Sequence, residues 1–299
     1  KNILYINEGN EKKLSFKKAP ENLNIGNLQN SFSTWIFDYN NDGLEDIFVS
    51  GYSNSDYSPA ALMMDYNMKN YSGNSPHLYK NVGNSKFKEV SASVGLNEPV
   101  TTMGCNIGDL NNDGYLDFYL ATGDPNYYSI VPNKMYLNNK GKSFDDITYA
   151  SGFGHIQKGH AVGFGDLDMD GDQDIYTVMG GALEGDNYSN VLYENPVGNE
   201  NNWINIKLEG VQSNRAAIGA KIILSITENG KKRKIYHSVG YDASFGGNSL
   251  LAEIGVGKAE KIDQLEVLWP NKKMNVSVFK NVKMVNCSYE GFLNYFFHV

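Results

Sequence analysis

The chain has 299 residues, of which 41% are apolar and 12% aromatic, a composition that can fill more than one hydrophobic core. Its formal net charge of −8 excludes a general electrostatic attraction to nucleic-acid phosphates or anionic lipid, so we expect no nucleic-acid partner. No apolar run is long enough for a transmembrane segment, and residues 1–9 lack the apolar block of a secretion signal, so a secreted form would already have lost its leader.

Glycine and tyrosine are abundant, with 31 and 20 copies against only 8 prolines, which favours short strands joined by tight turns. The two cysteines, Cys105 and Cys287, lie too far apart in sequence for a disulfide framework or a thiolate zinc site of ordinary spacing. The sequence leaves open whether they bond to each other.

Two sequence elements alternate along the first two thirds of the chain. The first is Leu/Met-Tyr-x-Asn, which begins at Leu4, Leu78, Met135 and Leu192, with the last three copies at equal intervals. The second is a nine-residue acidic stretch with Asp, Asn or Asp, Asp, Gly and Asp at positions 1, 3, 5, 6 and 9. It occurs three times, over residues 38–46, 109–117 and 166–174. An insertion at residues 53–74 predicts one enlarged loop in this array of internal repeats.

Each acidic stretch lies between two short segments with β-strand patterning. The second of these segments is followed by a tyrosine-containing loop and then by the Leu-Tyr segment. In the first two units a fourth strand is predicted at residues 87–90 and 144–147. Four short strands per repeat are typical of a propeller blade. Because the chain opens at a Leu-Tyr segment, we predict about three and a half blades over residues 1–197.

The acidic stretches have the donor set of a calcium loop. Side chains at positions 1, 3, 5 and 9 offer four oxygen donors, the glycine permits a sharp turn, and the carbonyl at position 7 adds a further ligand. A solvated turn is the alternative for a single copy, but three copies in register argue against it. Position 12 is Val49, Leu120 or Thr177 rather than the glutamate of an EF-hand, so we expect calcium loops inside β-hairpins.

Crowded carboxylates repel one another without a cation, so we predict three structural Ca²⁺ sites. The predicted ligands are Asp38, Asn40, Asp42, Leu44 and Asp46 in the first loop, Asp109, Asn111, Asp113, Tyr115 and Asp117 in the second, and Asp166, Asp168, Asp170, Asp172 and Asp174 in the third.

Beyond Asn195 no acidic stretch recurs, and strand-like segments follow at residues 203–208, 220–226, 233–239 and 264–269. Asn229-Gly230 between two of them is a strong hairpin signal. We therefore predict a small all-β domain over residues 198–299. Its Arg215 could pair with an acidic group, anchor the domain to the propeller or bond turn carbonyls.

The acidic repeats resemble the FG-GAP or VCBS family, the calcium-loop blades of integrin α-subunit heads and of many secreted bacterial proteins. This resemblance covers residues 1–197 and implies a ring of about seven blades, the missing ones coming from a longer chain or another subunit. Residues 213–221, 254–257 and 265–271 resemble the ASPIC/UnbV domain, although Ile254 stands where that family usually has Phe. Together they look like the cartilage acidic protein 1 family, which implies a calcium-binding protein that is extracellular or attached to the cell surface.

The loops that follow the second strand of each blade carry tyrosines among Asn and Asp residues. Strand alternation places these loops on the rim opposite the acidic turns, where tyrosines are suited to stacking on sugars or contacting a partner protein. Solvated loops whose tyrosines cover the blade edges are the alternative. The predicted rim residues are Tyr52, Tyr57, Tyr127, Tyr128 and Tyr188.

The sequence contains none of the common hydrolase, phosphate-binding or dinucleotide-binding motifs. His155 and His160 fit no common metal spacing. We therefore expect a non-enzymatic recognition or adhesion module for glycan or protein partners. The alternatives are a structural subunit of a surface assembly and a component of a polysaccharide-processing enzyme.

Overall fold

The computed structural model describes residues 2–10, 13–23, 25, 30–52, 75–123, 131–181, 183–196, 200–240, 245–271, 273–283 and 295–298. Strands account for nearly all regular structure there, as predicted, with two short 3-10 turns, η1 (Glu21–Leu23) and η2 (Ser91–Val94). None of the described residues forms a helix of the length and apolarity that crossing a membrane would require.

In two of the four-stranded antiparallel sheets, the order of the strands in the sheet follows their order in the chain, as in propeller blades. Blade 1 consists of β3 (Ser31–Phe37), β4 (Asp46–Gly51), β5 (His77–Asn81) and β6 (Phe87–Glu89). Blade 2 consists of β7 (Thr102–Gly108), β8 (Asp117–Thr122), β9 (Lys134–Asn138) and β10 (Phe144–Asp146). The predicted four-strand repeat is confirmed.

The array has a shorter sheet on either side of these two blades. Blade 3 has three strands, β11 (Gly159–Gly165), β12 (Asp174–Met179) and β13 (Val191–Tyr193). Before blade 1, β1 (Tyr5–Asn7) pairs only with β2 (Phe16–Lys18), which makes the predicted half-blade. The sequence reading had missed β2.

Neighbouring blades share apolar cores, which explains why the sheets stack in order. Cys105 and Ile107 of β7 are buried with Trp35 and Phe48 of blade 1. At the next interface, Phe164 of β11 is buried among side chains of blade 2. Inner strands therefore use one face to cover the blade before them.

The C-terminal region forms two further sheets. One contains β17 (Ala252–Gly257), β14 (Asn202–Glu209) and β20 (Tyr295–His298), and the other contains β16 (Lys231–Ser238), β15 (Lys221–Glu228), β18 (Lys261–Leu268) and β19 (Val276–Lys283). The predicted hairpin is confirmed: Glu228 pairs with Lys231 around Asn229 and Gly230, both with positive φ. The predicted domain boundary at residue 197 lies outside the described residues, between β13 and β14.

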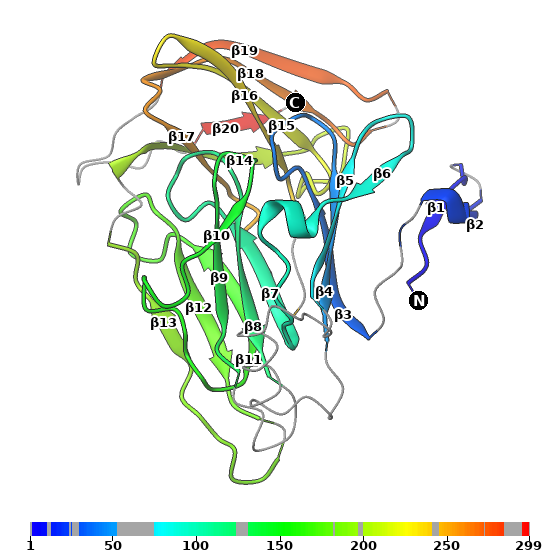
Figure 1. Cartoon of the computed structure of the whole chain (residues 1–299). Helices are drawn as coiled ribbons and strands as arrows, with labels where there is room; N and C mark the ends of the chain where they lie inside the picture. Colours follow the sequence, from blue (N-terminus) through cyan, green and yellow to red (C-terminus); the bar gives the residue numbers. More distant parts are fainter. Residues whose placement is uncertain are drawn as a thin grey trace.

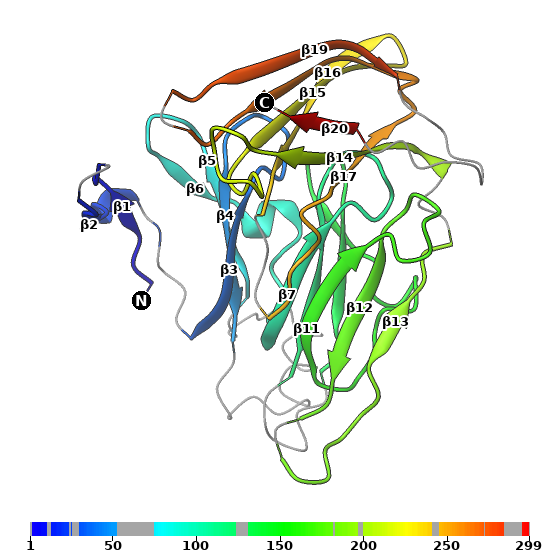
Figure 2. The ribbon, with the colours of Figure 1, turned by 180° about the vertical axis from the view of Figure 1, so that it is seen from behind.

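The C-terminal sheets lie across one end of the blades (Figure 1). The segment that leads into β17 leaves this layer and runs alongside β7 and β11 (Figure 2). Its Asn248 accepts hydrogen bonds from Asn106 Nδ2 and the Phe164 backbone N–H, and donates one to the Ile107 carbonyl. The inner strands of blades 2 and 3 are thereby bridged by one side chain of the C-terminal domain.

Candidate metal centre

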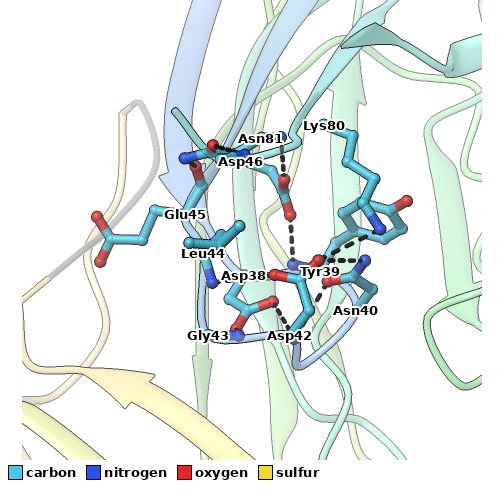
Figure 3. A network of polar contacts seen from close by, with 11 residues as sticks. Asp38, Tyr39, Asn40, Asp42, Gly43, Leu44, Glu45, Asp46, Lys80 and Asn81 are labelled. Atoms are coloured by element: carbon cyan, nitrogen blue, oxygen red, sulfur yellow. Dashed lines mark hydrogen bonds and ion pairs between the residues drawn. The ribbon is translucent and has the colours of Figure 1, made fainter. Parts of the chain in front are cut away.

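The first acidic stretch folds as a tight turn between β3 and β4 (Figure 3). The Asp38 carboxylate accepts the backbone N–H groups of Asp42 and Gly43, at 3.1 and 2.7 Å. Asn40 Oδ1 accepts the Asp42 N–H, and Asp42 Oδ1 accepts the Leu44 N–H. The side chains at positions 1, 3 and 5 thus point into the turn, because each accepts an N–H group of the turn itself.

The other two stretches repeat this hydrogen-bond pattern. In the second, the Asp109 carboxylate accepts the N–H groups of Asp113 and Gly114, at 3.0 and 2.8 Å. In the third, the Asp166 carboxylate accepts those of Asp170 and Gly171, both at 3.0 Å. The glycine at position 6 has a positive φ of 86°, 86° and 97° in the three turns, a conformation that favours glycine.

The aspartate at position 9 ties each turn to the Leu-Tyr strand of its blade. Asp46 accepts the N–H groups of Tyr39 and Asn81, and Asp117 accepts those of Leu110 and Asn138. Asp174 does the same with Leu167 and Asn195. Each carboxylate oxygen has a second lone pair, so these bonds leave acceptor capacity for a cation.

The turns hold their carboxylates where the surrounding protein disfavours charge. Burial raises the pKa of Asp38 to about 6 and that of Asp46 to about 7. The pKa of Asp117 is raised well above its usual range, mainly by burial and to a smaller extent by the nearby carboxylates of Asp109 and Asp113. Burial also raises the pKa of Asp109 and of Asp166. A bound cation would offset this cost.

The donor set fits a hard divalent cation. In the third turn, ligand oxygens of Asp166, Asp168 and Asp170 all lie within 4.8 Å of one another. The first and second turns have Asn40 and Asn111 in place of Asp168, with the same internal hydrogen bonds. Oxygen donors from carboxylates and amides on a flexible turn suit Ca²⁺ better than Zn²⁺ or copper. The backbone carbonyls of Leu44, Tyr115 and Asp172 stay predicted ligands.

The turns are also linked to one another by asparagine side chains. Asn41 and Asn112, at position 4, donate to the carbonyls of Gly114 and Gly171 in the following turn. Position 4 of the third turn is Met169, which cannot donate such a bond. This series of hydrogen bonds therefore has a direction and ends at blade 3.

The C-terminal domain rests directly on the second turn. The Gly255 N–H donates to Asp109 Oδ2 at 3.1 Å, and Arg233 Nη2 donates to the Asp113 carbonyl at 2.8 Å. The Gly257 N–H donates to the Asn112 carbonyl at 2.9 Å. Sequence reasoning missed these contacts, because the partners lie more than a hundred positions apart in the chain. The available signal was the pair of glycines within residues 254–257, since glycine allows another backbone to approach closely.

The first and third turns touch the same domain at fewer points. The Tyr236 N–H donates to Asn41 Oδ1, and Lys221 pairs with Glu45 at 2.7 Å. Beside the third turn, Gln173 Nε2 donates to Glu253. The acidic turns therefore form the base on which the C-terminal domain sits.

The remaining predicted residues lie elsewhere. Arg215 pairs with Glu209 of its own domain at 2.6 Å. His160 Nε2 contacts the Gly180 carbonyl and His155 packs edge-on against Tyr188, so the two histidines have different neighbours. Tyr188 is 52% exposed and Tyr52 stacks on Phe32. Cys105 is buried, and Tyr57, Tyr127, Tyr128 and Cys287 lie outside the described residues.

Comparison with protein families gives two matches, one among the blades and one in the C-terminal region. Residues 64–120 match the model of the FG-GAP-like repeat, and residues 210–286 match that of the ASPIC and UnbV domain. The chain has the FG-GAP plus UnbV architecture. The FG-GAP-like match includes the second acidic turn, and the ASPIC/UnbV match covers β15 to β19, including the Arg233 that contacts that turn. A search among curated proteins found no match.

Proposed function

We propose that the chain is a calcium-binding propeller module of an extracellular or cell-surface protein, which recognises glycan or protein partners. The observation that carries the calcium proposal is the threefold repetition of one donor arrangement at positions 1, 3, 5 and 9. FG-GAP-like and ASPIC/UnbV modules support the extracellular, adhesion-like assignment. Extracellular calcium modules bind with Kd on the order of 10⁻⁴–10⁻³ M, which suits a calcium-rich compartment.

Calcium would act on structure in this proposal. When bound, the ion supplies positive charge to carboxylates that burial otherwise penalises. The chain's own groups do the rest: position-9 aspartates hold each turn to its blade, and position-4 asparagines join the first turn to the second and the second to the third. An ordered second turn then presents Asp109 and the Asp113 carbonyl to Gly255 and Arg233.

Titration calorimetry tests the calcium proposal on the whole chain. We expect three sites, each with Kd near or below the millimolar range. The triple variant Asp109→Asn, Asp113→Asn, Asp117→Asn should lose one site and keep two. Heat signals indistinguishable from buffer across the millimolar range would contradict the proposal.

Recognition is proposed for the end of the blades opposite the acidic turns, since the C-terminal domain covers the near end. Tyr188 is an exposed aromatic group there, braced by His155 at a ring-centroid distance of 5.3 Å. Such a ring offers a face for a sugar or for a protein side chain. Tyr149, which is 71% exposed on the loop after β10, provides a matched control.

A glycan array probed with the calcium-loaded protein tests this second part. We expect Tyr188→Ala to reduce retention by about tenfold and Tyr149→Ala to leave it unchanged, since buried aromatic contacts dominate such interfaces. Equal retention by both variants would contradict the assignment of the rim. A polysaccharide hydrolysis panel on the same samples tests the proposal that the module is not catalytic.

A further inference from the structure

The charges of the chain are divided unevenly between its two parts. Residues 1–197 contain 13 Lys and Arg against 25 Asp and Glu, whereas residues 198–299 contain 13 against 9. The net charge of −8 therefore combines a strongly acidic blade region with a basic C-terminal region. A basic region of this kind can attract an anionic partner that the chain as a whole would repel.

The sheet of β16, β15, β18 and β19, which lies at the outer end of the C-terminal layer, has one buried face and one outer face (Figure 1). Leu224 and Ile226 of β15 lie on the buried face, within the core of the C-terminal domain. Successive side chains of a strand point to opposite faces of a sheet, so Ser225 and Thr227 lie on the outer face. Both are partly exposed, so this part of the outer face is open to solvent.

One row of polar side chains crosses all four strands on this outer face. Ser225 pairs with Lys234 of β16 on one side and with Gln264 of β18 on the other. Gln264 in turn pairs with Lys280 of β19. Adjacent strands lie about 4.8 Å apart, so the two lysines stand roughly 14 Å apart in this row. The hydroxyl group of Ser225 and the amide group of Gln264 lie between them.

A third lysine stands in the next row, towards the hairpin between β15 and β16. Lys232 pairs with Thr227, whose hydroxyl donates to Asp263 at 2.7 Å. Lys261 also pairs with Asp263, at 3.5 Å. Three lysines of this face take part in no ion pair between described residues, and all three are exposed. We call them the basic row: Lys232, Lys234 and Lys280.

Acidic groups on the outer face do not cancel this charge. Glu266 accepts a hydrogen bond from a side-chain amide of β18 at 3.0 Å. Glu266 and Asp263 give two carboxylates against four ammonium groups, which are those of the basic row and Lys261. At the other end of the face, Lys221 is paired with Glu45 of the first acidic turn at 2.7 Å. The face therefore keeps an excess of positive charge beyond that pair.

The groups around the basic row suit a sugar chain better than a single-stranded nucleic acid. Nucleic-acid single strands are bound through aromatic rings on which the bases stack. The aromatic side chain that β16 places on this face is Tyr236, which is half-buried against the first acidic turn: a Cβ on Gly43 would lie 3.1 Å from its ring. Hydroxyl and amide groups, by contrast, line the basic row and can form hydrogen bonds with sugar hydroxyls.

We propose that the outer face of this sheet binds an acidic polysaccharide, whose carboxylate or sulfate groups pair with the basic row. Charge complementarity selects such a partner. The lysines form charge-assisted hydrogen bonds with the anionic groups, and Ser225, Thr227 and Gln264 bind the hydroxyl groups between them. The site lies on the C-terminal domain, apart from the rim around Tyr188, and it needs no bound cation.

Affinity for heparin, a sulfated polysaccharide, tests the proposal on the whole chain in the presence of a chelator. We expect binding at low salt despite the net charge of −8, and none to neutral dextran. The triple variant Lys232→Gln, Lys234→Gln, Lys280→Gln should raise the Kd by about tenfold or more and reduce the slope of log Kd against log [NaCl] by about 2, because three counterion-releasing contacts are lost. The matched control Lys86→Gln, Lys88→Gln, Lys142→Gln removes the same charge from exposed positions among blades 1 and 2 and should change the Kd by less than about twofold.

The alternatives predict different results. Lysines on the edge strands of a sheet also prevent pairing with other chains, and that role alone predicts no affinity for heparin. Absence of binding by the unsubstituted chain, or equal losses in the two triple variants, would overturn the proposal. Tighter binding of a single-stranded oligonucleotide than of heparin, with the same loss in the basic-row variant, would assign the face to nucleic acid instead.

Two further variants separate charge from folding. The triple variant Lys232→Arg, Lys234→Arg, Lys280→Arg keeps the charge and should keep the Kd within about threefold, whereas a tenfold loss would show that charge does not hold the ligand. If the glutamine triple variant does not fold, Lys280→Gln alone takes its place with an expected loss of about threefold, and an unchanged Kd then overturns the proposal. Tyr188→Ala should leave heparin binding unchanged, so this site can fail while the rim and calcium proposals stand.

Discussion

The second and third acidic turns have the same backbone hydrogen bonds but different surroundings. The second is enclosed: Asp109 and Asp117 are buried, and Gly255 and Arg233 of the C-terminal domain bond to it. The third is more open, with Asp168 exposed and three carboxylates gathered within 4.8 Å. The nine-residue motif therefore sets the shape of the turn, while the residues packed on it decide how enclosed the proposed cation site is and how firmly the turn supports the C-terminal domain.

Removal of calcium should have the largest effect, because it acts on both kinds of turn. A site held at 100-fold its Kd contributes about 2.7 kcal/mol to the free energy of unfolding. Addition of a chelator should therefore lower the Tm by well over 5 °C, measured by scanning calorimetry. The Tm should recover on addition of Ca²⁺ but not of an equal ionic strength of NaCl. An unchanged Tm in chelator would show that calcium stabilises none of the three turns.

Gly255→Ala should break the enclosed turn selectively. An added Cβ would lie 2.2 Å from the Asn112 carbonyl carbon and 2.4 Å from Asp109 Oδ2, and neither backbone nor buried carboxylate can easily move. We expect the free energy of unfolding in urea to fall by about 3 kcal/mol. Gly163→Ala, whose Cβ would meet nothing closer than 3.9 Å, should change it by less than about 0.5 kcal/mol. Equal losses in both variants would show that the domain contact is not tight.

The pH dependence should reverse between the chelated and the calcium-loaded protein. The pKa of Asp46 is raised from 3.8 to about 7 by burial, so without a cation the folded state takes up a proton more readily than the unfolded chain. Through Asp46 alone, the chelated protein should gain roughly 3 kcal/mol as the pH falls from 7 to 4, measured by urea unfolding. The calcium-loaded protein should lose stability over this window, because protons displace the ion. Asp46→Asn should remove the part of this gain that Asp46 contributes and leave the part from the other buried aspartates, whose pKa burial also raises. A profile that the substitution leaves unchanged would assign the whole gain to those other groups.

Asp168→Asn should give the smallest effect, confined to the open turn. It converts position 3 into the amide found in the other two turns, and removal of one charge should weaken the third site by about tenfold, or ~1.4 kcal/mol. The reciprocal change Asn111→Asp should strengthen the second site by less, because burial penalises the added charge. Titration calorimetry measures both. A larger gain at the buried site than loss at the open one would contradict the role assigned to the surroundings.

Local chemistry made the blades and turns predictable from sequence, since glycine at position 6 and the alternating strand patterns act within a few residues. The turn around Asn229 was predictable for the same reason. The position of the C-terminal domain on blade 2 was not predictable, because it depends on contacts of Arg233 and Gly255 with residues of blade 2 that lie far away in the chain. The parallel pairing of β20 with β14 was missed for that reason too. The calcium ligands and the tyrosine rim stay predictions of residue chemistry.

The side chain of Asn248 between β7 and β11 has a consequence for any ring built on this arc. Propeller rings enclose an axial bore, and that bore is a common place for a ligand or a solvent channel. Here the strand-flanking segment with Asn248 lies against the walls that would face the bore and bonds to both of them. In a ring completed by further blades, this segment would therefore block the bore beside β7 and β11. A ligand would then bind on the outer surface of the ring or on the rim opposite the acidic turns.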